Sequence, residues 1–170
     1  ELLYHRSPNN FIRAHTSPPY YRGARGETVS KDHMRFLTFN SARDRDVAAG
    51  SIMSTVFFIL YETYGNCRNL TDADIARMPV PADSEFQHAI ASLSSELMRH
   101  MDKNAVRKKR EQKKTGTVIY DEYYVRQSKA QIDAIDRQLA ESFDLSDEAL
   151  DKIINYDIKY RMGADEDDAD

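Results

Sequence analysis

The chain has 170 residues, with 24 Lys and Arg against 28 Asp and Glu, one cysteine and no tryptophan. That length suits one domain with a helical appendage, and 17 aromatic side chains exclude a disordered chain. The single Cys67 excludes a disulfide framework and a thiolate metal cluster, so a cytoplasmic location is expected. The longest uncharged run, residues 47–61, is shorter than the about 20 residues that span a bilayer, so no membrane partner is expected.

Charge is divided along the chain. Residues 141–170 hold 11 acidic and 3 basic side chains, a net charge of -8, whereas residues 1–140 carry a net charge of +4. The final residues 164–170 are nearly all acidic and are predicted to be a disordered tail. The densest basic run, residues 107–110, is compatible with phosphate contacts and also with a solvated helix face.

The N-terminal half predicts a small sheet packed on a buried helix. Residues 1–7 and 11–16 read as a hairpin joined by Pro8-Asn9-Asn10, and residues 34–39 read as a third strand. Between them, two prolines predict an extended passage. A capping box at residues 41–44 opens a helix to about Tyr64, which is apolar around most of its circumference and must be buried.

The C-terminal half predicts helices. A capping box at residues 71–74 opens one short helix, and a box at residues 84–87 opens the longest helix, to about Gln112. Its narrow apolar seam suits one partner helix, so an oligomer through residues 84–112 is expected; the seam comprises Phe86, Ile90, Leu93, Leu97, Met101 and Ala105.

After this helix, residues 117–126 fit either a strand or a loop. A capping box at residues 128–131 and a helix ending at Gly163 then predict a helical hairpin. The apolar stripe of its first helix predicts that Asp133 and Asp136 face solvent. Three side chains near the end of the hairpin are expected to pack it onto the domain: Tyr156, Tyr160 and Arg161.

The expected fold class is therefore α+β: a small N-terminal β-hairpin or sheet packed on a buried helix, then a long helix and a C-terminal helical hairpin. We expect an α+β domain over residues 1–82, a helical region over residues 83–163, and the acidic tail over residues 164–170.

Catalytic chemistry is not readable from this chain. The five histidines show no metal-ligand spacing, and the six glycines form no phosphate-binding loop. Ser17-Pro18-Pro19-Tyr20 fits the signature of amino-group DNA methyltransferases, in which the aromatic ring stacks on a flipped base. Without a cofactor loop, the segment is interpreted as a bend leaving a strand. We expect no catalytic residue, no metal and no cofactor in this chain.

Two stretches carry a resemblance to a known family. The first, residues 48–81, contains an apolar helix, the loop Asn66-Cys67-Arg68-Asn69-Leu70 and the exit Met78-Pro79-Val80-Pro81. The second, residues 128–163, ends on Ile154-Asn155-Tyr156-Asp157-Ile158-Lys159-Tyr160-Arg161-Met162-Gly163. Together they resemble the C-terminal target-recognition region of type IIG adenine-specific DNA methylases in restriction–modification systems, and the recognition domains of type I specificity subunits.

The resemblance implies that this chain is a fragment that selects the DNA site. Its parent would be an S-adenosylmethionine-dependent adenine-N6 methyltransferase with the catalytic domain upstream, and its partner would be double-stranded DNA. Side chains of suitable type on irregular stretches are the candidate DNA contacts: Tyr20, Tyr21, Arg22, Arg25, Lys31, His33, Arg43, Arg45, Asn66, Arg68 and Asn69.

Other roles remain open at this point. Asn66 and Asn69 also suit shaping a turn, and Arg43 and Arg45 also suit pairing with the neighbouring Asp44 and Asp46. The alternative function for the whole chain is a helical protein–protein assembly module that docks through the 84–112 seam and the acidic tail.

Overall fold

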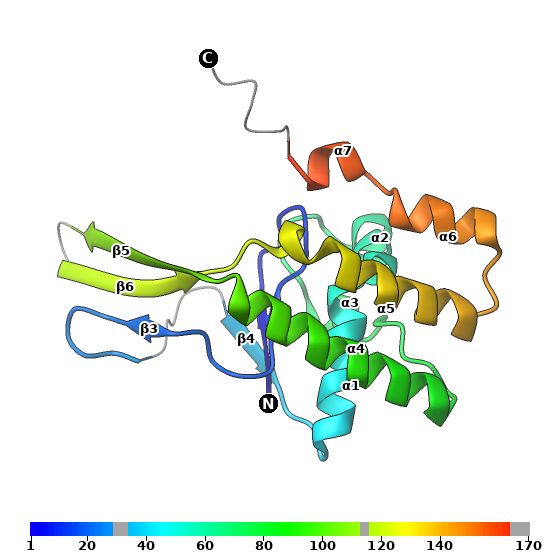
Figure 1. The fold of residues 1–170 in the computed structure, drawn as a ribbon, viewed down its shortest axis with the longest axis horizontal. Helices are drawn as coiled ribbons and strands as arrows, with labels where there is room; N and C mark the ends of the chain where they lie inside the picture. Colours follow the sequence, from blue (N-terminus) through cyan, green and yellow to red (C-terminus); the bar gives the residue numbers. More distant parts are fainter. Residues whose placement is uncertain (29–33, 113–115, 164–170) are drawn as a thin grey trace.

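The computed structural model describes residues 1–28, 34–112 and 116–163, which form an α+β fold. Two small antiparallel sheets lie beside a group of helices, and the second sheet extends away from that group (Figure 1). The predicted acidic tail at residues 164–170 lies outside the described residues.

The first sheet, sheet A, has the strand order β2-β1-β4. The predicted hairpin is confirmed, because β1 (Leu2–His5) pairs antiparallel with β2 (Ala14–His15). The predicted third strand is also confirmed as β4 (Met34–Leu37), on the other side of β1. Leu2 and Tyr4 alternate inward and are buried, so one face of sheet A covers the core.

The helix predicted over residues 41–64 is two helices. Ser41 caps α1 (Ala42–Met53) as expected, but the helix stops there and α2 (Thr55–Tyr64) leaves at 63°. Ser54 is extended between them, and its Oγ accepts a hydrogen bond from the Phe57 amide at 3.0 Å. The chain therefore contains a second N-cap inside the predicted helix.

A buried carboxylate holds this helix break. Oδ1 of Asp136 accepts hydrogen bonds from the backbone amides of Thr55 at 2.8 Å and Val56 at 3.2 Å. The prediction that Asp136 faces solvent is wrong, since its exposed fraction is 0%. Burial raises the pKa of Asp136 to about 6, although the hydrogen bonds from the α2 N-terminus lower it.

Arg161 lies against the same helix break. Its exposed fraction is 3%, and its Nη1 donates to Thr55 Oγ1 at 3.2 Å. Its guanidinium carbon lies 4.4 Å from the ring centre of Phe11 and 4.9 Å from that of Phe58. Burial lowers the pKa of Arg161, and the charge of Asp136 opposes that effect. The expected packing role of Arg161 is confirmed.

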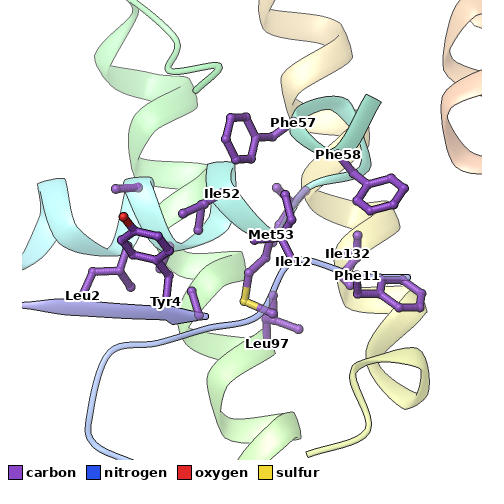
Figure 2. Packing of buried hydrophobic residues seen from close by; sticks show 14 of the residues in the cluster. Leu2, Tyr4, Phe11, Ile12, Ile52, Met53, Phe57, Phe58, Leu97 and Ile132 are labelled. Carbon is purple, nitrogen blue, oxygen red and sulfur yellow. The ribbon is translucent and has the colours of Figure 1, made fainter. Parts of the chain in front are cut away.

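The hydrophobic core draws on both halves of the chain. Figure 2 shows Leu2, Tyr4, Phe11 and Ile12 from the hairpin packed with residues of α1, α2 and the later helices. Gly50 on α1 lets α4 approach closely, because a Cβ at Gly50 would lie 2.8 Å from Cγ2 of Ile90. The core includes residues on both sides of residue 82, the boundary expected between the two domains.

The long helix is shorter than predicted. After the short helix α3 (Asp72–Ile75), whose Thr71 capping box is confirmed, α4 runs over Ser84–Lys103 with Asp83 as its N-cap. Its seam packs into the core rather than outward, since Ile90, Leu97 and Met101 are buried. Three of the six seam residues are therefore covered by the chain itself, and Phe86, Leu93 and Ala105 are half-buried.

Residues 106–112 form a strand, so the prediction of helix to Gln112 is wrong. β5 (Val106–Gln112) pairs along its full length with β6 (Gly116–Glu122), which confirms the strand reading of that segment. β6 also pairs with β3 (Tyr21–Arg22), giving sheet B with the order β3-β6-β5. Pairing with β6 overrides the helical preference of the Lys- and Arg-rich run.

The C-terminal helices pack on α2 and α4. A short 3-10 helix, η1 (Val125–Ser128), leads into α5 (Lys129–Ser142), which is followed by α6 (Asp147–Ile154) and α7 (Ile158–Arg161). Ser128 provides no side-chain cap, because its Oγ lies 2.9 Å from Nδ1 of His100. The expected packing of Tyr160 is wrong, since its exposed fraction is 73%, whereas the Tyr156 hydroxyl donates to Glu62 at 2.7 Å.

Candidate nucleic-acid interface

Four of the candidate DNA contacts lie on or beside β3, at the end of the molecule away from α5 and α6 (Figure 1). Tyr20 is 41% exposed and Arg22 is exposed, whereas Tyr21 is half-buried. Arg25 lies in a tight turn that the Gly23 amide closes by donating to the Glu27 carbonyl at 2.8 Å. Two further candidates, Lys31 and His33, lie outside the described residues.

The register of sheet B gathers basic side chains on one face. Arg22 and Lys109 both pair with Ile119, so all three side chains project to the same side. Arg107 projects to that side as well, and its guanidinium carbon lies 3.6 Å from the ring centre of Tyr20. We call this surface the outer face of sheet B and define it by Tyr20, Arg22, Arg107 and Lys109. The same register places the carboxylates of Glu111 and Asp121 on this side.

The cations of the outer face differ in how closely a carboxylate pairs with each of them. Arg107 is held by Asp121 through Nε and Nη2, and this hydrogen bond raises the pKa of Arg107. The Lys109 side chain is 64% exposed, and its Nζ lies 3.9 Å from Glu111, a weak surface contact. Arg22 has no carboxylate within 4.0 Å in the part of the chain that the structure describes. Arg22 and Lys109 are thus available to a phosphate.

The arginines at the start of α1 pair locally. Arg45 contacts Asp46 at 2.7 Å, and Arg43 lies 4.0 Å from Asp44 and 3.4 Å from Nε2 of His88. The Arg45–Asp46 contact favours the second reading of the sequence for Arg45, in which the neighbouring carboxylate neutralises the arginine. The 4.0 Å contact of Arg43 is as weak as that of Lys109, so Arg43 stays available to an outside partner.

The loop between α2 and α3 is shaped by its asparagines. Oδ1 of Asn66 accepts hydrogen bonds from the amides of Arg68 at 2.9 Å and Asn69 at 3.0 Å, which is an Asx turn. Oδ1 of Asn69 accepts the Ser7 hydroxyl at 2.8 Å, which ties the loop to the N-terminal hairpin. Both asparagines therefore have the turn-shaping role. Arg68 is exposed and remains the side chain of this loop best placed for an outside partner.

The candidate DNA contacts near β3, at the start of α1 and in the 66–69 loop do not form one compact site. In Figure 1, β3 lies at the left, the start of α1 at the bottom, and the 66–69 loop beside the tip of the N-terminal hairpin. Sequence reasoning missed Arg107 and Lys109 as members of the β3 group, because residues 106–112 show no alternation of apolar and polar residues. The turn-forming Gly116 and the following Val118, Ile119 and Tyr120 were the signal that a hairpin was present.

A pocket of about 340 Å³ separates the two sheets. Pro18, Pro19 and Tyr20 of the methyltransferase-like signature line it, together with Arg110 and Tyr120 of sheet B. This segment therefore forms part of the wall of the pocket between the two sheets.

His15 also lines this inter-sheet pocket. It is 3% exposed, and its ring meets Tyr123 edge-on at 4.6 Å. Among the described residues, its Nε2 has no hydrogen-bond partner. Burial lowers the pKa of His15 to about 3, so this ring is neutral at pH 7.

Comparison with known proteins gives no match to a family model, a curated protein or a solved structure. Residues 1–28, 34–112 and 116–163 contain no group of three or more His, Cys, Asp or Glu side chains arranged to hold a metal ion. Within the same ranges, no single helix is long and apolar enough to cross a membrane; only the bent pair α1 and α2, taken together, has that length and composition.

Proposed function

We propose that this chain is a sequence-specific duplex DNA recognition module. The observation that carries the proposal is the exposed basic outer face of sheet B, where Arg22 and Lys109 are available and Arg107 is stacked on Tyr20. Phosphate contacts of this kind position a protein on DNA, while nearby side chains read base edges. As the sequence resemblance implies, the parent would be a cytoplasmic S-adenosylmethionine-dependent adenine methyltransferase whose catalytic domain lies elsewhere in a longer chain.

The shape of sheet B supports this function. β5 and β6 form a two-stranded antiparallel ribbon of seven residues per strand. At about 3.4 Å per residue such a ribbon is roughly 24 Å long, and the major groove of B-DNA admits a two-stranded ribbon. β5 is an edge strand, and its side chains from Val106 to Glu111 are exposed. A ribbon with one free basic edge can enter a groove while the opposite strand, β3, faces a phosphate backbone.

The alternative of a helical assembly module has lost its main support. It relied on the apolar seam of residues 84–112, but Ile90, Leu97 and Met101 are in the core. The remaining part of that segment, residues 106–112, is a strand without an apolar stripe.

The test is duplex binding measured by fluorescence anisotropy over a series of salt concentrations. Each phosphate contact contributes roughly -0.9 to the slope of log K against log salt, so removing one contact reduces the slope by about 1. Arg22→Ala and Lys109→Ala should each produce that change. Lys152→Ala is the matched control, because Lys152 is an equally exposed cation that pairs with Glu148 on α6.

Sequence preference is measured by selection from a random duplex library. The proposal requires an enriched site with the wild-type chain, and a salt slope that both outer-face variants reduce. Binding without salt dependence, or equal slopes for the outer-face variants and Lys152→Ala, would contradict it.

A further inference from the structure

Arg107 is the cation of the outer face that a carboxylate holds most closely. In the register of sheet B it pairs with Asp121, whose carboxylate oxygens accept hydrogen bonds from Nε and Nη2 of Arg107. The Asp121 side chain is only 15% exposed, so it is a firm anchor for the guanidinium. By contrast, Lys109 lies 3.9 Å from Glu111, whose side chain is 80% exposed. The carboxylate therefore fixes the side chain of Arg107 but not that of Lys109.

The ring of Tyr20 covers one face of the same guanidinium. The guanidinium carbon of Arg107 lies 3.6 Å from the ring centre, which is a stacked cation–π contact. The Tyr20 carbonyl accepts a hydrogen bond from the Asp121 amide at 3.0 Å, so the residue that stacks is tied to the residue that anchors. The side chain of Arg107 is still 53% exposed, so a group outside the protein can reach it.

The donors of Arg107 that Asp121 leaves unused form a complete fork. A guanidinium donates from Nε and from both Nη atoms, and Asp121 takes the Nε donor and one donor of Nη2. Both donors of Nη1 and the second donor of Nη2 remain, and they lie side by side at the end of the side chain. Among the residues that the structure describes, none accepts a hydrogen bond from Nη1. This fork matches a planar group that carries two neighbouring acceptors.

The charge of Asp121 decides which acceptors suit this fork. Because the carboxylate lies against the guanidinium, the pair has no net charge and attracts a phosphate less strongly than Arg22 or Lys109 does. A base edge is neutral and requires paired donors rather than net charge. In the major groove, guanine presents O6 and N7 side by side, and an arginine fork is the commonest specific contact to them. The outer face thus combines cations suited to phosphates with an arginine suited to a base.

We infer that Arg107 reads a guanine in the major groove, held in place by Asp121 and stacked on Tyr20. The inference rests on the proposed function, because sheet B must bring a base edge to Arg107. Arg107 and Lys109 are two residues apart on one face of β5, roughly 7 Å at about 3.4 Å per residue. One seated ribbon can therefore place Lys109 at the backbone and Arg107 at a base. A guanidinium that is already fixed loses little side-chain freedom on binding, which favours specific contact.

The first experiment removes the pair without changing the net charge. The double variant with Arg107→Gln and Asp121→Asn should lose roughly fivefold or more of its preference for guanine at one position of the enriched duplex. Its salt slope should equal that of the wild-type chain, because no net charge is removed. Lys109→Ala, the matched control on the same face, should reduce the slope by about 1 and keep every base preference. A double variant with a reduced slope and an unchanged guanine preference would overturn the inference.

The single variant Asp121→Asn tests the positioning role. It releases the guanidinium of Arg107 and leaves its charge uncompensated, so the guanine preference should weaken while the salt slope becomes steeper by about 1. A merely structural role for Asp121 would not steepen the slope. An unchanged guanine preference together with an unchanged slope would overturn the positioning role.

A modified duplex tests the contact with the wild-type chain. A guanine analogue with C–H in place of N7 removes one of the two acceptors, and at the position read by Arg107 it should weaken wild-type binding roughly threefold or more. The same analogue should leave binding by the double variant unchanged. Equal losses in both proteins at every guanine of the site would overturn the inference.

Failure of this inference is distinguishable from failure of the proposed function. A wild-type chain that enriches no duplex site contradicts the proposed function and overturns this inference with it. An enriched site at which the double variant keeps every guanine preference overturns this inference alone, because salt-dependent binding through Arg22 and Lys109 still stands.

Discussion

The helix break at Ser54 gives a quantitative prediction about Asp136. Asp136 supplies the acceptor for the buried amides of Thr55 and Val56, at 2.8 and 3.2 Å. Asp136→Ala removes this acceptor and leaves the backbone amides of Thr55 and Val56 without it. An unsatisfied buried donor typically costs about 1–3 kcal/mol, so we expect the free energy of unfolding to fall by about 2–6 kcal/mol for the two amides.

Asp136→Asn separates the hydrogen bonds from the charge. The amide keeps an oxygen that can accept from both backbone amides but has no titrating group. In the wild-type chain, burial raises the pKa of Asp136 from 3.8 to about 6. The folded state therefore holds this proton more tightly than the unfolded chain, so the contribution to stability is present below pH 4 and is lost as the pH rises through 6.

The size of that loss is about 3 kcal/mol, because each step of one in pKa corresponds to about 1.4 kcal/mol. We therefore expect the stability of Asp136→Asn relative to wild type to improve by about 3 kcal/mol between pH 4 and pH 7. Urea unfolding of both proteins at the two pH values measures this difference. A difference that stays constant with pH would refute a raised pKa for Asp136, and an Asn variant as unstable as the Ala variant at pH 7 would refute the acceptor role.

Three other predictions concern separate regions. His15→Phe should remove an acid-dependent loss of about 3 kcal/mol between pH 7 and pH 4, because a pKa lowered from 6.5 to about 3 makes wild-type stability fall as the pH drops below 6.5. Urea unfolding at the two pH values measures this loss, and an unchanged pH dependence would contradict it. Gly50→Val should lower the free energy of unfolding by about 1–3 kcal/mol, because a Cβ at Gly50 would already lie 2.8 Å from Ile90 across the α1–α4 contact. Adding Ile90→Ala should recover part of that loss in urea unfolding, and additive losses in the double variant would argue against a direct clash. Arg68→Ala should relax base preference at one position of a selected DNA site and cost about 1–3 kcal/mol of binding; an unchanged preference would remove Arg68 from the readout.

Local signals in the sequence predicted the elements whose hydrogen bonds are local. The Ser41 cap and the Thr71 capping box satisfy amides three residues away, and both are confirmed. The break at Ser54 was not predictable in this way, because Asp136, 81 residues from Thr55, supplies its second acceptor. A carboxylate opposite the apolar stripe of its own helix is buried when another helix ends against it.

The candidate site was predictable only in part for a related reason. Tyr20 and Arg22 were recognised by residue type, but their neighbours on the outer face come from β5, which has the composition of a solvated helix. The pocket that Arg13, Arg126 and Arg161 line combines the N-terminal hairpin, the segment after β6 and the last helix. Nothing in the local sequence around Arg13 indicates that Arg126 lies on the same cavity.

The buried network also bears on how the family resemblance is to be interpreted. Asp136 and Arg161 both belong to the second resembling stretch, residues 128–163, and both are used inside the fold to hold the start of α2. Side chains that are buried and charged tolerate few substitutions, because any replacement strands a partner in a low-dielectric environment. The resemblance in this stretch therefore follows from construction of the fold and does not by itself argue for DNA reading. The exposed outer face of sheet B has no such constraint, so under the proposed function that face, rather than the resembling helices, is where target specificity should be sought.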